Sequence, residues 1–268
     1  MKRVILLIGC LLFNVAVLAQ DTLIVGVVPQ FESHRIRDIW QPVIDELSSR
    51  TGLRLELRQA INIPSFEKEL ADEVYDIVYL NPYHLLMANQ DNGYLPIVKD
   101  STRLLSGILV VSKTSGITSI EQLNQQEIAF PAPNALGASL MIRAELSRKN
   151  IEFTPVYVHS HSSVYLNTAL GVSKAGGGVL HSLKQQKDSI QSKLTILYQT
   201  SKVAPHPVAI HPRILGLQPE IYTAFEAMFK SEEGKEMLNK IPMRGVEAAT
   251  LSDYDNLKTL NLERFVEK

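Results

Sequence analysis

One candidate binding site lies at Asn134-Ala135-Leu136-Gly137-Ala138-Ser139, between a segment broken by prolines and a predicted helix over 138–147. The backbone N–H groups in the first turn of a helix have no partner inside the helix. Together with the helix dipole they favour a phosphate or another small anion at that point. The alternative is a plain asparagine cap at Asn134, and the spacing alone does not decide between the two.

A second candidate site follows the predicted strand over 156–159. His159 and His161 stand two residues apart, so both side chains can face the same side. A metal ion would need further ligands, and no spacing singles them out among His181, His206 and His211. We therefore predict no metal. In the alternative interpretation, His161 or Ser162 caps the next helix, over 162–170, and contacts a ligand there.

Tyr83 is the third candidate. It follows Asn81-Pro82, directly after the apolar run 76–80, and an apolar helix and the turn Gly93-Tyr94 come next. In open α/β sheets, ligands bind just beyond the carboxyl ends of the strands, where Tyr83 stands. The alternative, which spacing alone favours, is an aromatic side chain packed at a turn.

The motifs of common enzyme classes are missing from the sequence. It contains no G-x-S-x-G elbow, no Walker loop and no H-E-x-x-H helix. The triplet Gly176-Gly177-Gly178 lacks the Lys-Ser/Thr pair of a phosphate loop, so we expect it to allow close packing of a strand against a helix. Ser162 beside His161 is a sequence neighbour and no arranged catalytic pair. We predict no enzymatic activity and no cofactor.

The amino terminus has the pattern of a secretory signal peptide. Lys2-Arg3 precede an uncharged run from Val4 to Ala19, and polar residues follow. The run, of about 16 residues, is short for a membrane span, and we predict cleavage after Ala19. The alternatives are a membrane anchor and a lipid attached to Cys10, the only cysteine of the chain.

The remaining chain predicts an α/β fold. It has 268 residues in all, 45% of them hydrophobic, and its formal net charge of −1 is spread along the sequence, without the basic block that binds nucleic acid. Strand-like apolar runs alternate with helical periodicity, which predicts mainly parallel sheets flanked by helices. About ten short strands are many for one sheet, so we expect two lobes, with chain crossings near 104–111 and 198–206.

Local signals mark several helix ends. The helix with apolar residues from Ile36 to Leu47 should end at Gly52 and should kink or restart at Pro42. Ser65 is the expected cap of a helix that runs to about residue 74, and Ser231 is the expected cap of a helix near the end of the chain.

The order of these segments resembles one family, the periplasmic binding proteins of phosphate, phosphite and phosphonate ABC importers. The resemblance covers nearly the whole chain after residue 20. It rests on YDIVYLNPYHLLMA and GYLPI within 75–97, SGILVVSKTSGITSIEQLN at 106–124, IAFPAPNALGAS at 128–139, HSHSSVYLNTALG at 159–171 and AGGGVLHSL at 175–183. It implies a two-lobed, type 2 periplasmic-binding fold with the ligand between the lobes. Lobe 1 would comprise residues 20–105 and 202–268, and lobe 2 residues 106–201.

The resemblance also implies site residues. Tyr83 matches the aromatic of the first lobe, Asn134 to Ala138 match the loop and helix start that cradle the oxyanion, and His161 with Ser162 and Ser163 match the second-lobe contact. The predicted ligand-binding residues are therefore Tyr83, Asn134, Ala135, Leu136, Gly137, Ala138, His161, Ser162 and Ser163.

Two positions depart from the family pattern. The loop at 134–138 lacks the hydroxyl groups that are usual there. Lys174 stands where an aspartate is usual, and an aspartate could pair with the amine of an aminoalkyl phosphonate. Lys174 would instead favour an anion if it faces the cleft, and the alternative is an exposed lysine.

The function that follows is a periplasmic solute-binding protein that captures a small oxyanion of the phosphate, phosphite or phosphonate class. Its partner would be the membrane permease of an ABC importer. The divergent loop motivates an alternative, in which the protein is the ligand-sensing partner of a membrane sensor kinase or cyclase.

Overall fold

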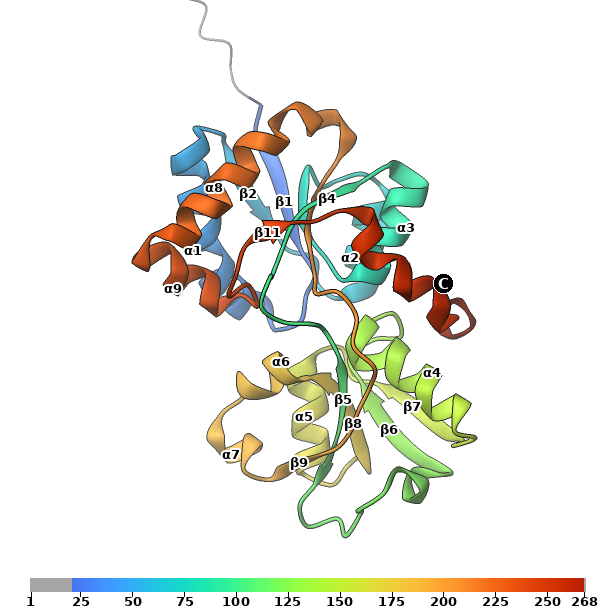
Figure 1. Cartoon of the computed structure of the whole chain (residues 1–268). Helices are drawn as coiled ribbons and strands as arrows, with labels where there is room; N and C mark the ends of the chain where they lie inside the picture. The colour runs from blue at the N-terminus through green and yellow to red at the C-terminus, as the bar shows by residue number, and fades with distance from the viewer. Residues whose placement is uncertain (1–20, 268) are drawn as a thin grey trace, which may run out of the picture.

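The computed structural model describes residues 21–267, which form two lobes that each contain one sheet (Figure 1). The sheet of lobe 1 has the order β11-β4-β10-β3-β1-β2, and that of lobe 2 the order β7-β6-β8-β5-β9. The two-lobed α/β prediction is confirmed. The strands of lobe 1 are β1 (Leu23–Val27), β2 (Leu55–Arg58), β3 (Ile77–Tyr79), β4 (Leu95–Lys99), β10 (Val208–Ile210) and β11 (Glu247–Ala248). Those of lobe 2 are β5 (Gly107–Ser112), β6 (Gln126–Phe130), β7 (Phe153–Tyr157), β8 (Ala175–Val179) and β9 (Leu194–Gln199).

Most strands of each sheet run in one direction, as expected, and the reversed strands make both sheets mixed. In lobe 1, β1 runs parallel to β2 and β3, but β10 runs antiparallel to β3 and β4. In lobe 2, β6 runs parallel to β7 and β8, but β5 runs antiparallel to β8 and β9. The reason is connectivity. β5 and β10 are the first strands after the chain crosses between lobes, so they run away from the crossing, whereas the parallel strands run toward it.

Helices cover both sheets. Those of lobe 1 are α1 (Ser33–Thr51), α2 (Ile63–Ala71), α3 (Pro82–Asn92), α8 (Gln218–Lys230) and α9 (Glu232–Lys240). Those of lobe 2 are α4 (Met141–Arg148), α5 (His161–Ala169), α6 (Leu180–Lys184) and α7 (Asp188–Gln191). Short 3-10 helices lie at Ile120–Leu123, Pro212–Leu217, Leu251–Leu260 and Leu262–Phe265, and a π-helix at Leu136–Leu140 leads into α4.

The core of lobe 2 shows how the strands position the helices. Along β5, Leu109 and Val111 pack in one hydrophobic cluster with residues of α4, while Ile108 and Val110 pack in another with Tyr165 of α5. Successive side chains of a strand point to opposite faces of the sheet, so a continuous apolar run is buried on both sides. β5 is therefore an interior strand of its sheet, covered on both faces.

Several predicted helix ends are confirmed. Gly52 ends α1 in the left-handed conformation, at φ 69°, which glycine adopts without steric cost. The side chain of Ser231 accepts a hydrogen bond from the Gly234 N–H and caps α9. Pro42 lies inside α1, which continues without a restart.

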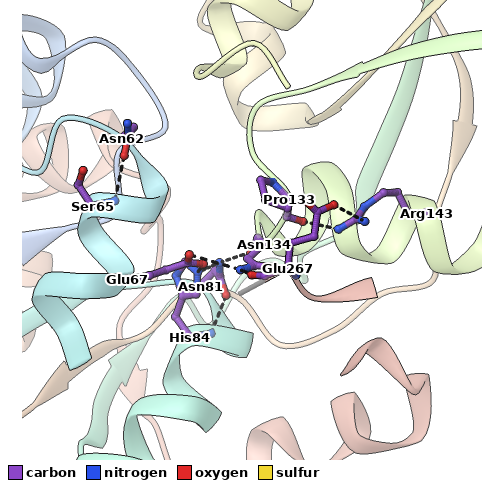
Figure 2. Close-up of polar contacts among 9 residues, drawn as sticks. All are labelled: Asn62, Ser65, Glu67, Asn81, His84, Pro133, Asn134, Arg143 and Glu267. Atoms are coloured by element: carbon purple, nitrogen blue, oxygen red, sulfur yellow. Dashed lines mark hydrogen bonds and ion pairs between the residues drawn. The ribbon is translucent and has the colours of Figure 1, made fainter. Parts of the chain in front are cut away.

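Two predicted caps are wrong. Asn62, and not Ser65, caps α2, because the Asn62 side chain accepts from the Ser65 N–H at 2.9 Å (Figure 2). Ser160, and not His161 or Ser162, caps α5, because its hydroxyl accepts from the Ser163 N–H at 3.1 Å. Ser65 and Ser163 are each the third residue of their helix. The true cap accepts a hydrogen bond from the N–H of that residue.

The chain crosses between the lobes twice, from β4 to β5 and from β9 to β10 (Figure 1). The two crossing segments pair with each other, since Leu105 and Val203 exchange two backbone hydrogen bonds of 2.9 Å. The boundaries predicted at 105/106 and 201/202 fall within these segments and remain a prediction.

The predicted signal peptide, residues 1–19, lies outside the described residues. Within residues 21–267, no helix has the length and apolar character needed to cross a membrane.

Candidate functional site

A cavity of about 560 Å³ lies between the lobes, beside the two crossing segments. The carboxyl ends of β3 and β8 reach it, as expected for a ligand site in an α/β fold. Its lining in lobe 1 is Gln30, Tyr79, Asn239, Pro242 and Arg244. Its lining in lobe 2 and the crossing segments is Asp100, Thr102 to Ser106, Val179 to His181, Lys184, Gln185, Gln199, Lys202, Pro205 and His206.

Positive charge dominates the lining of this cavity. Four cationic side chains contribute to it, Arg103, Lys184, Lys202 and Arg244, against one carboxylate, Asp100. The excess is three positive charges, in a chain whose net charge is −1. A cleft lined by charges of one sign attracts small ligands of the opposite sign.

The single carboxylate, Asp100, is already fully engaged. Its Oδ1 accepts from the Thr102 N–H at 2.9 Å, the Thr102 hydroxyl at 2.8 Å and the Gly245 N–H at 3.0 Å. Its Oδ2 pairs with the Nε of Arg103 at 3.0 Å. Arg103 keeps its Nη2 buried and without a hydrogen-bond partner among the described residues. Asp100 thus orients Arg103, and one end of the guanidinium group remains available.

His181 lies in the same positive field. Burial, and then repulsion from Arg103, Arg244 and Arg35, lowers the pKa of His181 to about 4. Arg103 and Arg244 line the same cavity as His181, so their positive charges disfavour a protonated ring there. A bound anion would relieve this repulsion.

Aromatic rings form the inner wall. Tyr79 stacks on His206 with 5.4 Å between ring centroids. Trp40, which is not part of the lining, packs against Tyr79 with 4.7 Å between ring centroids. Burial, and then repulsion from His84, His161 and His181, lowers the pKa of His206 to about 3. Burial also raises the pKa of Tyr79 far above its ordinary value. Near neutral pH this wall is therefore uncharged.

None of the nine predicted ligand-binding residues lines the cavity. Tyr83 is the second residue of α3 and is half-buried against the core of lobe 1. Burial raises its pKa. Its predicted role as a ligand contact is not tested by its position and stays a prediction.

Asn134 joins the two lobes (Figure 2). Its backbone carbonyl accepts from the Asn81 amide at 3.3 Å, and its own amide donates to Glu67 at 3.3 Å and to the Glu267 carbonyl at 2.8 Å. Its Oδ1 accepts from the Glu267 N–H at 3.1 Å. Ala135, not Asn134, precedes the first helical residue, so the plain asparagine cap is wrong.

Ala135, Leu136, Gly137 and Ala138 are buried and packed on the sheet of lobe 2. A Cβ placed on Gly107 would meet the Gly137 carbonyl oxygen at 2.0 Å. The loop therefore lies in direct contact with β5, through backbone atoms. Its predicted contact with an anion stays a prediction.

The carboxyl-terminal segment, residues 261–267, covers this loop from outside. Arg143 of α4, 6% exposed, donates to the carbonyl oxygens of Pro133 at 2.7 Å and Phe265 at 2.5 Å. It also pairs with Glu267 at 3.4 Å (Figure 2). Arg148, exposed on the same helix, donates to the Leu260 carbonyl at 2.5 Å.

His161 is buried at the start of α5, with its Nδ1 2.8 Å from the Ser182 hydroxyl. Burial, and then repulsion from His181, lowers its pKa to about 4, so it is neutral near pH 7. Ser162 donates to Glu32 of lobe 1 at 3.4 Å, and Ser163 is the residue whose N–H the cap Ser160 binds. The predicted second-lobe residues thus lie next to His181 and on the contact between lobes.

The lobes also touch beside the cavity. Besides the contacts of Asn134 and Ser162, Arg35 of α1 donates to the Gln185 carbonyl at 2.5 Å and to its side-chain oxygen at 2.9 Å. Gln185 also lines the cavity, so the contact with Arg35 lies at its edge.

Lys174 does not face the cavity. It is exposed and precedes the first residue of β8, whereas the cavity lies at the other end of that strand, at Val179. A strand of five residues spans about 16 Å. Lys174 is therefore the exposed lysine of the alternative interpretation.

The glycine triplet serves close packing, as predicted. A Cβ on Gly176 would meet the Thr168 hydroxyl at 2.3 Å, and one on Gly178 would meet the Tyr165 hydroxyl at 2.0 Å. Both contacts come from α5, which can approach the strand this closely only because the side chains are missing. For the described residues, no group of three or more His, Cys, Asp or Glu side chains could hold a metal ion.

A family model described as "ABC transporter, phosphonate, periplasmic substrate-binding protein" matches residues 25–254. The chain belongs to this family. This match confirms the resemblance seen in the sequence. It also confirms that the protein is a solute-binding component of a transport system. This family is not a class of enzymes, and the match supports the importer interpretation while adding nothing to the sensor alternative.

Solved structures share the fold. PhnD1 of Prochlorococcus marinus (MIT 9301), in complex with methylphosphonate, has a TM-score of 0.84 at 16% identity, covering 91% of this chain and 98% of that one. A binding protein component of an ABC phosphonate transporter from Pseudomonas aeruginosa has a TM-score of 0.79 at 14% identity, covering 92% and 88%. A Xanthomonas citri protein bound to ATP has a TM-score of 0.74 at 14% identity, covering 92% and 99%. At these identities the structures establish the fold alone.

Proposed function

We propose that this protein binds a phosphonate, or a related phosphorus oxyanion, in the interlobe cavity and delivers it to the permease of an ABC importer. The observation that carries the proposal is the excess of three positive charges in that cavity. The family supports the transport role, and PhnD1 of Prochlorococcus marinus, with the same fold, was solved with methylphosphonate.

The head group would sit against Arg103 and Arg244, close to His181. The free Nη2 of Arg103 supplies a buried donor, and Arg244 is exposed toward the cavity. A hydrogen bond to a charged group contributes about 1.5–3 kcal/mol. Two or three of them approach the roughly 8 kcal/mol of micromolar binding, before the cost of ordering the ligand.

The residues predicted from the resemblance have a second role in this proposal. Asn134 and Ser162 make contacts between lobes, so they would hold the closed state, and opening would free their polar groups. Tyr83, Ala135 to Ala138, His161 and Ser163 are proposed to contact the ligand during entry, before closure. The protein would act in the periplasm after cleavage behind Ala19, without enzymatic activity.

Titration calorimetry of residues 20–268 against phosphate, phosphite and methylphosphonate tests the proposal. At least one should bind with micromolar affinity, and Arg244→Gln should weaken it by about tenfold or more, the equivalent of one charge-assisted bond. Arg54→Gln is the matched control, because Arg54 is an exposed arginine that does not line the cavity. Failure of all three anions to bind would refute the proposed ligand class.

A further inference from the structure

The cavity has an apolar wall beside its positive charges. Leu104, 61% exposed, comes from the first crossing segment, and Leu180, 41% exposed, is the first residue of α6. Both line the cavity, together with Val179, Pro205 and Pro242. Large aliphatic side chains are most often buried, so exposed leucines inside a ligand cavity indicate apolar surface that a ligand can cover.

Among the described residues, the cavity offers no free carboxylate to an ammonium group. Asp100 is its only carboxylate, and its oxygens already accept four hydrogen bonds, one of them from Arg103. An amine would also meet the like charges of Lys184 and Arg244, which costs binding energy. Lys174 faces away from the cavity and changes nothing in this balance.

The cavity is larger than a bare oxyanion needs. Its volume of about 560 Å³ lies within the range of roughly 300–1,000 Å³ that holds organic ligands of substantial size. A ligand with only the head group would leave the leucine wall in contact with water.

We infer that the ligand carries a phosphonate or phosphate-monoester head group and an uncharged apolar substituent larger than a methyl group. The head group lies at Arg103, Arg244 and His181, and the substituent covers Leu104 and Leu180. The inference rests on the proposed function of the cavity and makes the two leucines determinants of specificity.

Trp40 provides the readout. It is the one tryptophan of the chain, and its ring lies 4.7 Å from that of Tyr79, which lines the cavity. Its fluorescence is followed while the protein is titrated with methylphosphonate, n-propylphosphonate, 2-aminoethylphosphonate and n-propyl phosphate, each repeated by calorimetry. The propyl and aminoethyl phosphonates have the same number of heavy atoms and differ in the terminal charge.

Each buried methylene strengthens binding roughly fourfold. n-Propylphosphonate should therefore bind at least about fivefold tighter than methylphosphonate, and at least about tenfold tighter than 2-aminoethylphosphonate. n-Propyl phosphate shows whether the cavity accepts an ester oxygen. The inference is supported if either propyl compound binds more tightly than methylphosphonate does.

Leu180→Asn should reduce the propyl-to-methyl ratio below about threefold, because it removes apolar surface at nearly constant size. Leu166→Asn is the control, since Leu166 is 45% exposed on α5 and does not line the cavity. It should leave the ratio unchanged.

Two results would overturn the inference alone: equal affinity for the aminoethyl and propyl phosphonates, or an unchanged ratio in Leu180→Asn. If no compound binds, including methylphosphonate, the proposed function fails as well. The two failures are therefore distinguishable.

Discussion

Acid should destabilise this protein through His161. The imidazole is 2% exposed, and its Nδ1 lies 2.8 Å from the Ser182 hydroxyl. Burial, and then repulsion from His181, lowers its pKa from 6.5 to about 4. The unfolded chain, in which the ring is in water, takes up the proton at higher pH than the folded chain does.

The sign and size of the effect follow from these two values. Above pH 6.5 the ring is neutral in both states and costs no stability. As the pH falls from 6.5 toward 4, only the unfolded state gains the proton, so the free energy of unfolding decreases. At pH 5 the loss relative to pH 8 is about 2 kcal/mol for this one histidine.

Urea denaturation at pH 8 and pH 5 measures the effect. We expect His161→Gln to lose about 2 kcal/mol less than the parent protein between the two pH values, because glutamine has no proton to gain. His181 and His206 contribute to both proteins, so the difference isolates His161. His34→Gln is the control, since His34 is exposed on α1.

The reasoning about burial would be refuted if His161→Gln lost as much stability between pH 8 and pH 5 as the parent protein. The ring would then titrate alike in the folded and unfolded states.

Two further predictions concern packing. Arg143→Met should lower the free energy of unfolding by about 3–5 kcal/mol and expose the segment 261–267 to proteolysis, because two backbone carbonyls lose their donor. Arg148→Met, at an exposed position of the same helix, is the control and should lower the free energy of unfolding by less than about 1 kcal/mol. Equal losses in the two variants would contradict this account. Gly178→Ala should destabilise by about 2 kcal/mol or more in thermal unfolding, because its Cβ would fall 2.0 Å from the Tyr165 hydroxyl. Gly216→Ala, with no atom within 4 Å, is the control, and similar melting temperatures for the two variants would disprove the close packing.

The fold could be predicted because its signals are local. Gly52 ends α1 and Ser231 caps α9 through contacts within a few residues. The strand directions could not be read in this way. Whether β5 and β10 run parallel or antiparallel depends on the side from which the crossing chain enters each sheet, and no residue in either strand encodes it.

The site was harder to predict, because its contacts join distant parts of the chain. Asn134 meets Glu67 and Glu267, which are 67 and 133 residues away in the sequence. Arg244 follows α9 without any motif, so its place in the cavity depends on the packing of lobe 1. Tyr79 and His181 could have been found, since they stand at strand ends by the rule that drew attention to Tyr83.

The location of the bound ligand tests the central claim most directly. A crystal structure of the protein grown with methylphosphonate should show the head group in the interlobe cavity, within hydrogen-bond distance of Arg103 and Arg244. A head group bound at the start of the Leu136–Leu140 helix instead, out of reach of both arginines, would contradict the account.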